Sequence, residues 1–240
     1  MNKVNGLLYG LLSSASFGLI PLFTIPAMQA GMQFESILFY RFLFACLALG
    51  GILLVNGQSF RIKRQDIPSL FLLALLYLMS AVFLFWGYKF MASGVATTIH
   101  FLGLFIVLLS ALGYALYLVT MSQLKIGQMK GLLLTFYVFL FGGILLFIGT
   151  ETISQLQPIS EWHTAGNLIL LALIPTVVSN LALVRAVKSI GSTLTSVLGA
   201  MEPVTAVCVG IFLFGEAFTT SIGVGIALII AAVIVIILKR

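Results

Sequence analysis

Phe39-Tyr40-Arg41-Phe42-Leu43-Phe44 returns as Phe136-Tyr137-Val138-Phe139-Leu140-Phe141, with five of six residues identical. The shift between the two stretches is 97 residues, and the same shift lays residues 6–13 over residues 103–110. A repeat with one constant offset indicates a duplicated structural unit, and it constrains the architecture more than any local pattern. Residues 199–240 have no partner, because their counterparts would fall where the second copy has already begun. The first copy is therefore shorter than the second.

The composition places both copies in a membrane. Hydrophobic residues make up 61% of the chain and charged residues only 8%, which is too little charge to cover a soluble domain of this length. Apolar stretches near twenty residues recur, and each is long enough to cross a bilayer. We predict an all-α integral membrane protein with eight transmembrane helices, at about 6–28, 35–55, 68–90, 95–122, 130–150, 164–187, 192–213 and 219–238.

These spans divide into a first repeat at 1–101, with three spans, and a second repeat at 102–240, with five. Both numbers are odd, so the second copy enters the membrane from the opposite side and the halves form an inverted repeat. Small residues recur every fourth position in the first and last spans, which predicts faces where helices approach closely. These residues are Gly6, Gly10, Ser14 and Gly18, and Gly223, Ala227 and Ala231.

Basic residues set the expected orientation. With the N-terminus inside, ten of the twelve Lys and Arg residues fall on the cytoplasmic side, as the positive-inside rule requires. They are Lys3, Arg61, Lys63, Arg64, Lys125, Lys130, Arg185, Lys188, Lys239 and Arg240. We predict a multi-pass protein of the cell membrane with both termini cytoplasmic. The net charge of +6 then records orientation and does not indicate a nucleic-acid partner.

Other features have ordinary explanations. Lys3 followed by an apolar run and small residues resembles a signal peptide, but the run continues to Met28, so we expect a retained spanning helix. Cys46 and Cys208 lie inside predicted spans and favour simple packing. The two histidines, His100 and His163, are far apart, and no phosphate loop or metal-ligand spacing is present. We expect no enzyme activity, no metal and no cofactor.

Gly199-Ala200-Met201-Glu202-Pro203-Val204-Thr205-Ala206, continuing to Gly215-Glu216, resembles the ninth span of EamA-type transporters of the drug/metabolite transporter superfamily. Residues 186–193 and 223–237 resemble the neighbouring link and the tenth span. The resemblance implies ten spans in two inverted five-span repeats. This chain departs from that pattern after Phe101, where the fourth and fifth spans would follow and at least 42 residues are absent. We expect the remnant of the fourth span to fuse with the next span near 95–122.

The resemblance implies a membrane transporter, an exporter or permease for small metabolites or drugs that works by alternating access. Its partners would be a small-molecule substrate, a coupling proton, the lipid bilayer and a second copy of the chain. Two alternatives stay open: a truncated relative that inserts without transporting, and a non-transport membrane scaffold or sensor. The missing spans predict a lateral opening beside the central cavity, filled by lipid or by a second protomer.

Arg41 and Glu202 are the charged residues deep inside predicted spans, roughly 9 Å and roughly 15 Å from the nearer membrane edge. Buried charge is costly unless it faces a cavity or a partner. Either residue is a candidate for orienting a charged or zwitterionic substrate, and Glu202 is a candidate for carrying a proton. A purely structural contact between helices is the alternative.

Prolines and aromatic residues complete the candidate site. Pro203 removes an amide donor and frees the carbonyl of Gly199, which predicts a helix break near the middle of the membrane. Pro21 and Pro175 predict kinks in the same way, with packing alone as the alternative. Trp86, Tyr114 and Tyr117 are candidate cavity-lining residues, although aromatic residues in membranes more often pack or meet lipid.

Overall fold

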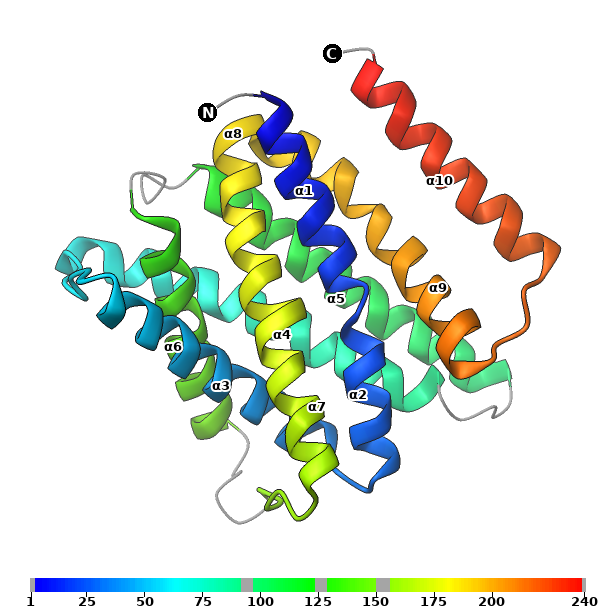
Figure 1. Cartoon of the computed structure of the whole chain (residues 1–240), viewed down its shortest axis with the longest axis horizontal. Helices are drawn as coiled ribbons and strands as arrows, with labels where there is room; N and C mark the ends of the chain where they lie inside the picture. Colours follow the sequence, from blue (N-terminus) through cyan, green and yellow to red (C-terminus); the bar gives the residue numbers. More distant parts are fainter. Residues whose placement is uncertain (1–2, 92–96, 124–128, 150–155, 239–240) are drawn as a thin grey trace.

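The computed structural model describes residues 3–91, 97–123, 129–149 and 156–238, and every regular element in these ranges is helical. Figure 1 shows the arrangement of the helices. Lys125, Lys239, Arg240 and the side chain of His100 lie outside what the structure describes. The elements are α1 (Lys3–Phe17), α2 (Ile20–Gln29), α3 (Phe34–Val55), the short η1 (Arg64–Asp66), α4 (Ile67–Met91), α5 (Thr97–Gln123), α6 (Gly131–Gly149), α7 (Trp162–Ala172), η3 (Leu173–Val178), α8 (Ser179–Gly199), α9 (Met201–Phe214) and α10 (Thr220–Leu238).

The prediction of eight spans is wrong in its count. Within the described ranges, seven helical stretches are long and apolar enough to cross a membrane. The expected spans 164–187 and 192–213 belong to one helical stretch, Trp162–Phe214, because the short polar link between them, which contains Lys188 and Ser189, stays helical except at Gly191. Gly191 bends that stretch, with a φ of 80° and a ψ of 167° that glycine adopts readily. Beyond this bend the chain turns back and α9 descends beside α1 (Figure 1).

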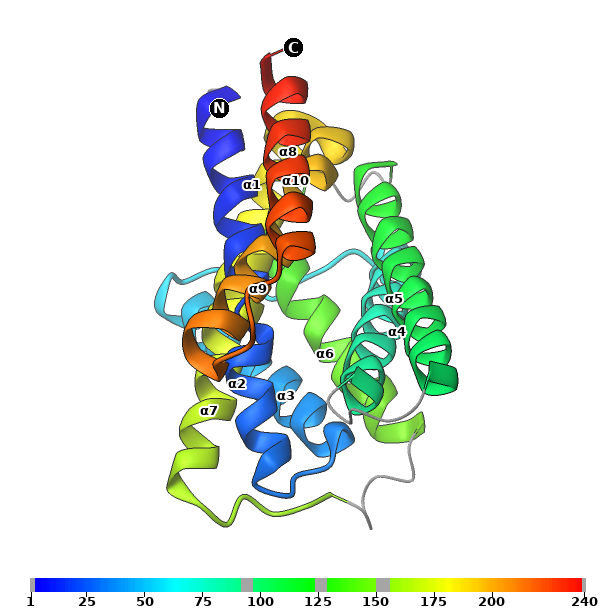
Figure 2. The same cartoon turned by 90° about the vertical axis from the view of Figure 1, so that its right-hand side faces the viewer.

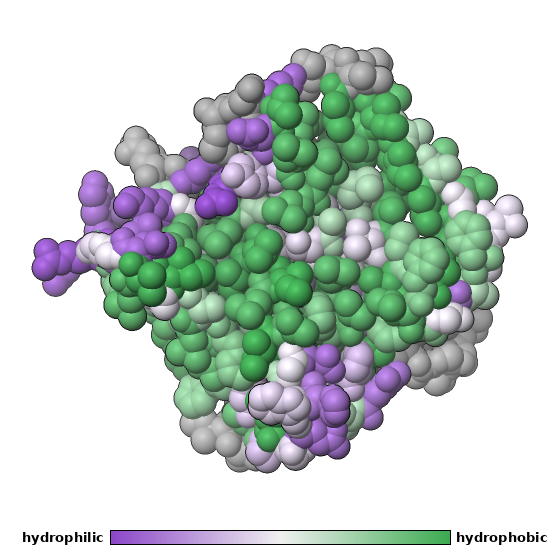
Figure 3. Space-filling model, in the orientation of Figure 1, coloured by the Kyte–Doolittle hydropathy of each residue, from purple (hydrophilic) through white to green (hydrophobic). Residues whose placement is uncertain are grey.

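The surface has the pattern of a multi-pass membrane protein. Figure 3 shows a broad hydrophobic band with hydrophilic residues gathered at its two edges. Large apolar side chains in that band point outward, such as Leu47 (63% exposed) and Leu54 (70% exposed). Lipid tails can cover these side chains at no cost, which water could not do. The first turn of α1 and the last turns of α10 lie at the same end of the molecule (Figure 2).

The two most extensive helix contacts correspond to each other under the repeat. α1 packs along α8, and α5, which is the counterpart of α1, packs along α4. Each contact has a pair of hydrogen-bonded serines at its centre: Ser13 with Ser179, and Ser110 with Ser80, with Oγ···Oγ distances of 3.3 Å in both. Ser13 and Ser110 are 97 residues apart. Both contacts thus join a helix of the first half to a helix of the second half.

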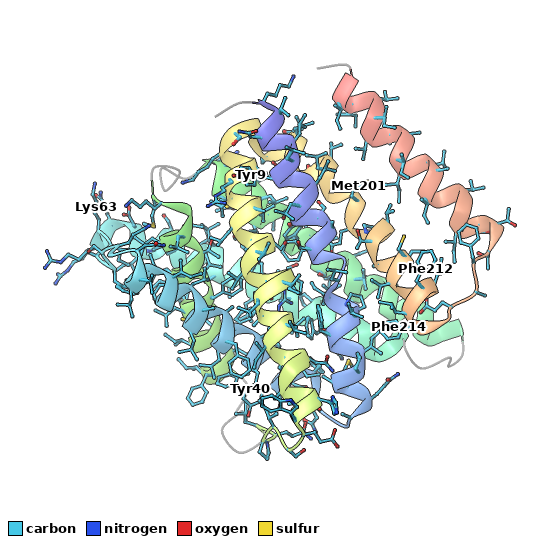
Figure 4. The ribbon with its side chains drawn as sticks, viewed as in Figure 1. Tyr9, Tyr40, Lys63, Met201, Phe212 and Phe214 are labelled. Atoms are coloured by element: carbon cyan, nitrogen blue, oxygen red, sulfur yellow. The ribbon has the colours of Figure 1, made fainter. Side chains whose placement is uncertain are left out.

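A second pair of contacts follows the same offset and joins α3 and α6 to loops of the opposite half. The hydroxyl of Tyr40 donates to the carbonyl of Gln157 at 3.0 Å, and the hydroxyl of Tyr137 donates to the carbonyl of Phe60 at 2.6 Å. Both the donors and the acceptors are separated by 97 residues. Figure 4 places Tyr40 at the opposite edge from Lys63, which lies in the loop that contains Phe60. An inverted repeat requires such reciprocal contacts at the two faces of the membrane.

The small residues of α1 let neighbouring helices approach. A methyl group added at Gly10 would lie 2.4 Å from Leu198 of α8, and one at Gly18 would lie 2.5 Å from Thr205 of α9. The second predicted stripe, on α10, is not packed in this way, since Ala227 and Ala231 are exposed. Only 6% of the residues in the span Thr220–Ile237 are buried. The helix α10 therefore presents its surface to the membrane and contributes little to the core.

Candidate functional site

A cavity of about 380 Å³ lies between the two halves of the molecule. Its walls come from α1 to α4 of the first repeat and from α5, α8 and α9 of the second. Most of the wall is apolar, with side chains such as Phe17, Leu84 and Val107. Arg41 and Glu202, the intramembrane charges singled out from the sequence, both line it, as do Tyr114, Gly199 and Pro203. A mostly apolar pocket with a few convergent polar groups is the usual form of a small-molecule site.

Arg41 is buried in α3, with 1% of its surface exposed. Its Nε donates to Thr176 Oγ1 at 2.6 Å, its Nη2 donates to the Tyr77 hydroxyl at 3.3 Å, and its guanidinium lies 5.4 Å from the centre of the Phe85 ring. These neutral partners replace part of the hydration that the cation has lost, and the ring adds a cation–π attraction. The remaining N–H groups leave room for an anion.

A polar network behind Arg41 joins the two halves. Asn180 of α8 donates through Nδ2 to the Tyr77 hydroxyl at 3.1 Å and to the Thr176 carbonyl at 2.8 Å. Asn180 and Thr176 are fully or almost fully buried. Thr176 Oγ1 also donates to the Leu171 carbonyl at 2.7 Å. The side chains of this network are thus held by more than one contact each, which limits their freedom to reorient.

Pro175 explains how Thr176 reaches Arg41. It lies in η3, a π-helical turn that continues α7 into α8. Proline has no amide hydrogen, so the regular ladder is interrupted there, and π-turns within helices often occur at functional sites. The distorted turn presents Thr176 toward α3, where its hydroxyl accepts the hydrogen bond from Arg41.

Glu202 lies in the first turn of α9, next to Pro203 and two residues beyond the connecting Ala200. A carboxylate at a helix N-terminus is favoured by the unpaired amides and the helix dipole. Among the residues that the structure describes, no ion pair within 4.0 Å joins this carboxylate to Arg41. The two charges therefore share a cavity without neutralising each other directly.

The break between α1 and α2 lies on the same side of the cavity as Glu202. α1 ends at Phe17 and α2 starts at Ile20, with Pro21 in its first turn. At this break Gly18 comes so close to α9 that an added methyl group would lie 2.6 Å from the Glu202 carbonyl. Because glycine has no side chain, α9 can pack directly against the break, which positions Glu202 at the cavity wall.

The aromatic candidates separate into three positions. Tyr114 lines the cavity and meets Phe17 edge-on, with ring centres 5.9 Å apart. Tyr117 is buried behind it, 6.2 Å from Tyr114 between ring centres, and is not part of the wall. Trp86 is 38% exposed, stacks on Phe83 and lies outside the cavity. The cavity therefore includes only Tyr114 of these three.

Tyr77, Thr176 and Asn180 were not among the candidates drawn from the sequence. Each is an uncharged polar residue in a largely apolar span, and such residues are common enough in membrane helices that none stands out. Within the described part of the chain, no group of three or more His, Cys, Asp or Glu residues could hold a metal ion. Cys46 and Cys208 are half-buried free thiols.

Comparison with known families finds the EamA-like transporter family twice along the chain, at residues 4–103 and again at residues 101–238. The two matches together span nearly the whole sequence. A search among curated proteins found no match.

Proposed function

The chain belongs to the EamA-like transporter family, and on this premise we propose that it moves a small charged or zwitterionic metabolite or drug across the membrane. Family membership and the apolar helices make it a multi-pass membrane protein of the transporter type, and they argue against an enzyme. The substrate would bind in the cavity between the repeats.

One observation supports this proposal above the others. The cavity brings together Arg41 from the first half and Glu202 from the second, without a direct ion pair between them. A solute with complementary charge would contact both halves at once. Its binding would then be sensitive to their relative position, which is the condition for coupling binding to a conformational change.

Alternating access would proceed by rocking of the two halves about this site. The reciprocal hydrogen bonds of Tyr40 and Tyr137 lie toward opposite faces of the membrane. We propose that these bonds tie α3 to the segment before α7 and α6 to the segment after α3, so that α3 and α6 form the common axis while the outer helices move. Glu202 would carry the coupling proton, because a carboxylate at this depth can exchange a proton with the cavity.

The wider proposal follows the distribution of charge along the chain. The cell membrane would be the location, with both termini in the cytoplasm, because the basic loops lie on that side. The large exposed surface of α10 would contact lipid or a second protomer.

A transport-inactive relative is the second candidate. α9 packs against α1, but among the described residues the first repeat has no helix after α4 to take the corresponding place beside α5. One wall of the cavity then depends on lipid or on another subunit. A protein of this kind would insert and bind without completing a transport cycle.

Uptake into proteoliposomes would test the proposal. The purified full-length chain would be screened with radiolabelled cationic, anionic and zwitterionic solutes, alongside Glu202→Gln and the control Trp86→Phe, which lies outside the cavity. We expect uptake of a charged solute by the wild-type chain, a loss of roughly tenfold or more in Glu202→Gln, and no change in Trp86→Phe. Folded wild-type protein that carries no solute would favour the inactive relative.

A further inference from the structure

We propose that Tyr77 determines specificity by offering its hydroxyl proton to a carboxylate of the substrate, next to Arg41. This inference rests on the proposed function, since it assigns the chemistry of one end of the same cavity. Tyr77 lies on α4 and lines the cavity wall with only 3% of its surface exposed.

The hydroxyl oxygen of Tyr77 already accepts two hydrogen bonds. One comes from Arg41 Nη2 at 3.3 Å and the other from Asn180 Nδ2 at 3.1 Å. Arginine has no acceptor atom, so the first bond has only one direction. A phenol oxygen has two acceptor positions and one proton, and both positions are occupied here. Tyr77 can therefore act toward a ligand only as a donor.

The direction of the Asn180 bond is also determined. The side-chain atom of Asn180 that faces Tyr77 lies 2.8 Å from the Thr176 carbonyl. A carbonyl only accepts hydrogen bonds, so this atom must be the amide nitrogen. Rotating the amide by half a turn would place two acceptors against each other. Asn180 thus donates to Tyr77 and prevents Tyr77 from donating back.

The free donors at this end of the cavity match a carboxylate. Among the described residues, the Tyr77 hydroxyl donates to no acceptor, since its hydrogen bonds with Arg41 and Asn180 are both accepted. Arg41 uses its Nε and one Nη2 hydrogen, so part of its five-donor fork is also unused. A carboxylate has two oxygens, which allows one contact with the guanidinium and one with the phenol. Bonds to charged groups in a low dielectric are strong, so a solute without the carboxylate would bind much more weakly.

Glu202 lines the same cavity, and its carboxylate favours a positively charged group of the substrate. Between these two groups the wall is largely apolar. L-Phenylalanine carries both charges and an apolar ring, and two simple relatives each lack one charge. Phenethylamine lacks the carboxylate, and 3-phenylpropionate lacks the amine. These three compounds serve as probes of the two ends.

The experiment compares binding and uptake of the three probes by the full-length wild-type chain, Tyr77→Phe and Tyr117→Phe. Tyr117 is the matched control, because its ring packs 5.4 Å from that of Tyr77 but does not line the cavity. For the wild type and Tyr117→Phe we expect L-phenylalanine to bind roughly tenfold or more tightly than phenethylamine. In Tyr77→Phe that ratio should fall several-fold, because phenethylamine makes no contact with the missing hydroxyl. The ratio within one variant does not depend on how much of the protein is folded.

The outcomes separate the two proposals. An unchanged ratio in Tyr77→Phe would overturn the role of Tyr77, whereas continued wild-type uptake would leave the transport function standing. Wild-type preference for phenethylamine over L-phenylalanine, or uptake restricted to solutes without a carboxylate, would also overturn it. A wild-type chain that carries no solute at all would contradict the proposed function itself and this inference with it.

Discussion

Thr176→Val should reveal how much of the fold depends on keeping Arg41 hydrogen-bonded. Thr176 is completely buried, and its Oγ1 accepts from Arg41 Nε at 2.6 Å while donating to the Leu171 carbonyl at 2.7 Å. Valine has nearly the same shape, so the change removes the polar contacts and leaves little cavity. The cation is then left with an unpaired donor in an apolar environment.

The magnitude follows from the two lost bonds. Neutral hydrogen bonds between membrane helices contribute about 0.6 kcal/mol on average, whereas bonds to a charged group contribute about 1.5–3 kcal/mol. The loss of the Arg41 bond should therefore dominate. We expect Thr176→Val to lower the free energy of unfolding by roughly 2–3 kcal/mol, which is roughly a 30- to 150-fold change in the unfolding equilibrium.

Thr135→Val is the matched control. Thr135 is also buried, at 1% exposure, and its Oγ1 donates to the Gly131 carbonyl at 2.8 Å, but no charged group in the described part of the chain donates to it. Unfolding by SDS titration of the detergent-solubilised chain, followed by circular dichroism, would measure both variants. A double-mutant cycle with Arg41→Met would isolate the coupling.

If both threonine variants lost the same stability within about 0.5 kcal/mol, the argument for Arg41 would be refuted. Additivity of Thr176→Val and Arg41→Met would refute it independently, since the two groups would then not interact.

Three further results are expected. Tyr40→Phe and Tyr137→Phe should each lower the free energy of unfolding by about 0.5–1.5 kcal/mol in the same SDS titration, because each removes one repeat-related hydrogen bond. A large decrease for one variant and none for the other would contradict the symmetry. Gly191→Ala should destabilise the fold by roughly 1–2 kcal/mol, because the φ of Gly191 is +80°. Gly166→Ala, in an open helical position, should be neutral or stabilising. Equal effects of the two substitutions would show that the bend at Gly191 is not required. Reporter fusions at the C-terminus and in the 56–63 loop should both give a cytoplasmic signal, and an external signal from either would reverse the proposed orientation.

The candidate site could be predicted from the sequence only in part. Arg41 and Glu202 were identifiable because a charge inside an apolar span is costly wherever the helix lies. Pro203 and Gly199 were identifiable because proline disrupts a helix in any environment. Tyr77 and Asn180 gave no such signal, since a single tyrosine or asparagine in a span is compatible with lipid, packing or a cavity. Trp86 was a weaker candidate, because a large aromatic ring suits a lipid-facing surface as well as a cavity wall, and the structure places it outside the cavity.

The span count shows the same limit for the fold. Hydropathy places a boundary at the polar residues Arg185 and Lys188, but the chain stays helical through them and bends at Gly191 within α8. The structure therefore has one bent helical stretch where two separate spans were expected. The bend depends on backbone dihedral angles that composition does not record. Conversely, α5 runs unbroken from Thr97 to Gln123 across the boundary at 101 and 102, as its continuous apolar sequence predicts.

The sequence by itself determined the membrane class, the family and the duplicated halves, because hydrophobic length, motif and repeat are properties of the chain in order. Tertiary structure decided which polar groups meet. Helices such as α3 and α4 are apolar on nearly every face, so periodicity does not indicate how each one is rotated against its neighbours. That rotation brings Arg41 to Thr176 and Tyr77, and it leaves Glu202 across the cavity instead of in direct contact. Close packing at small residues of the neighbouring helices accompanies it: a methyl group added at Gly142 of α6 would lie 2.8 Å from Phe42 of α3, and one at Gly113 of α5 would lie 3.2 Å from the Ser80 amide nitrogen of α4.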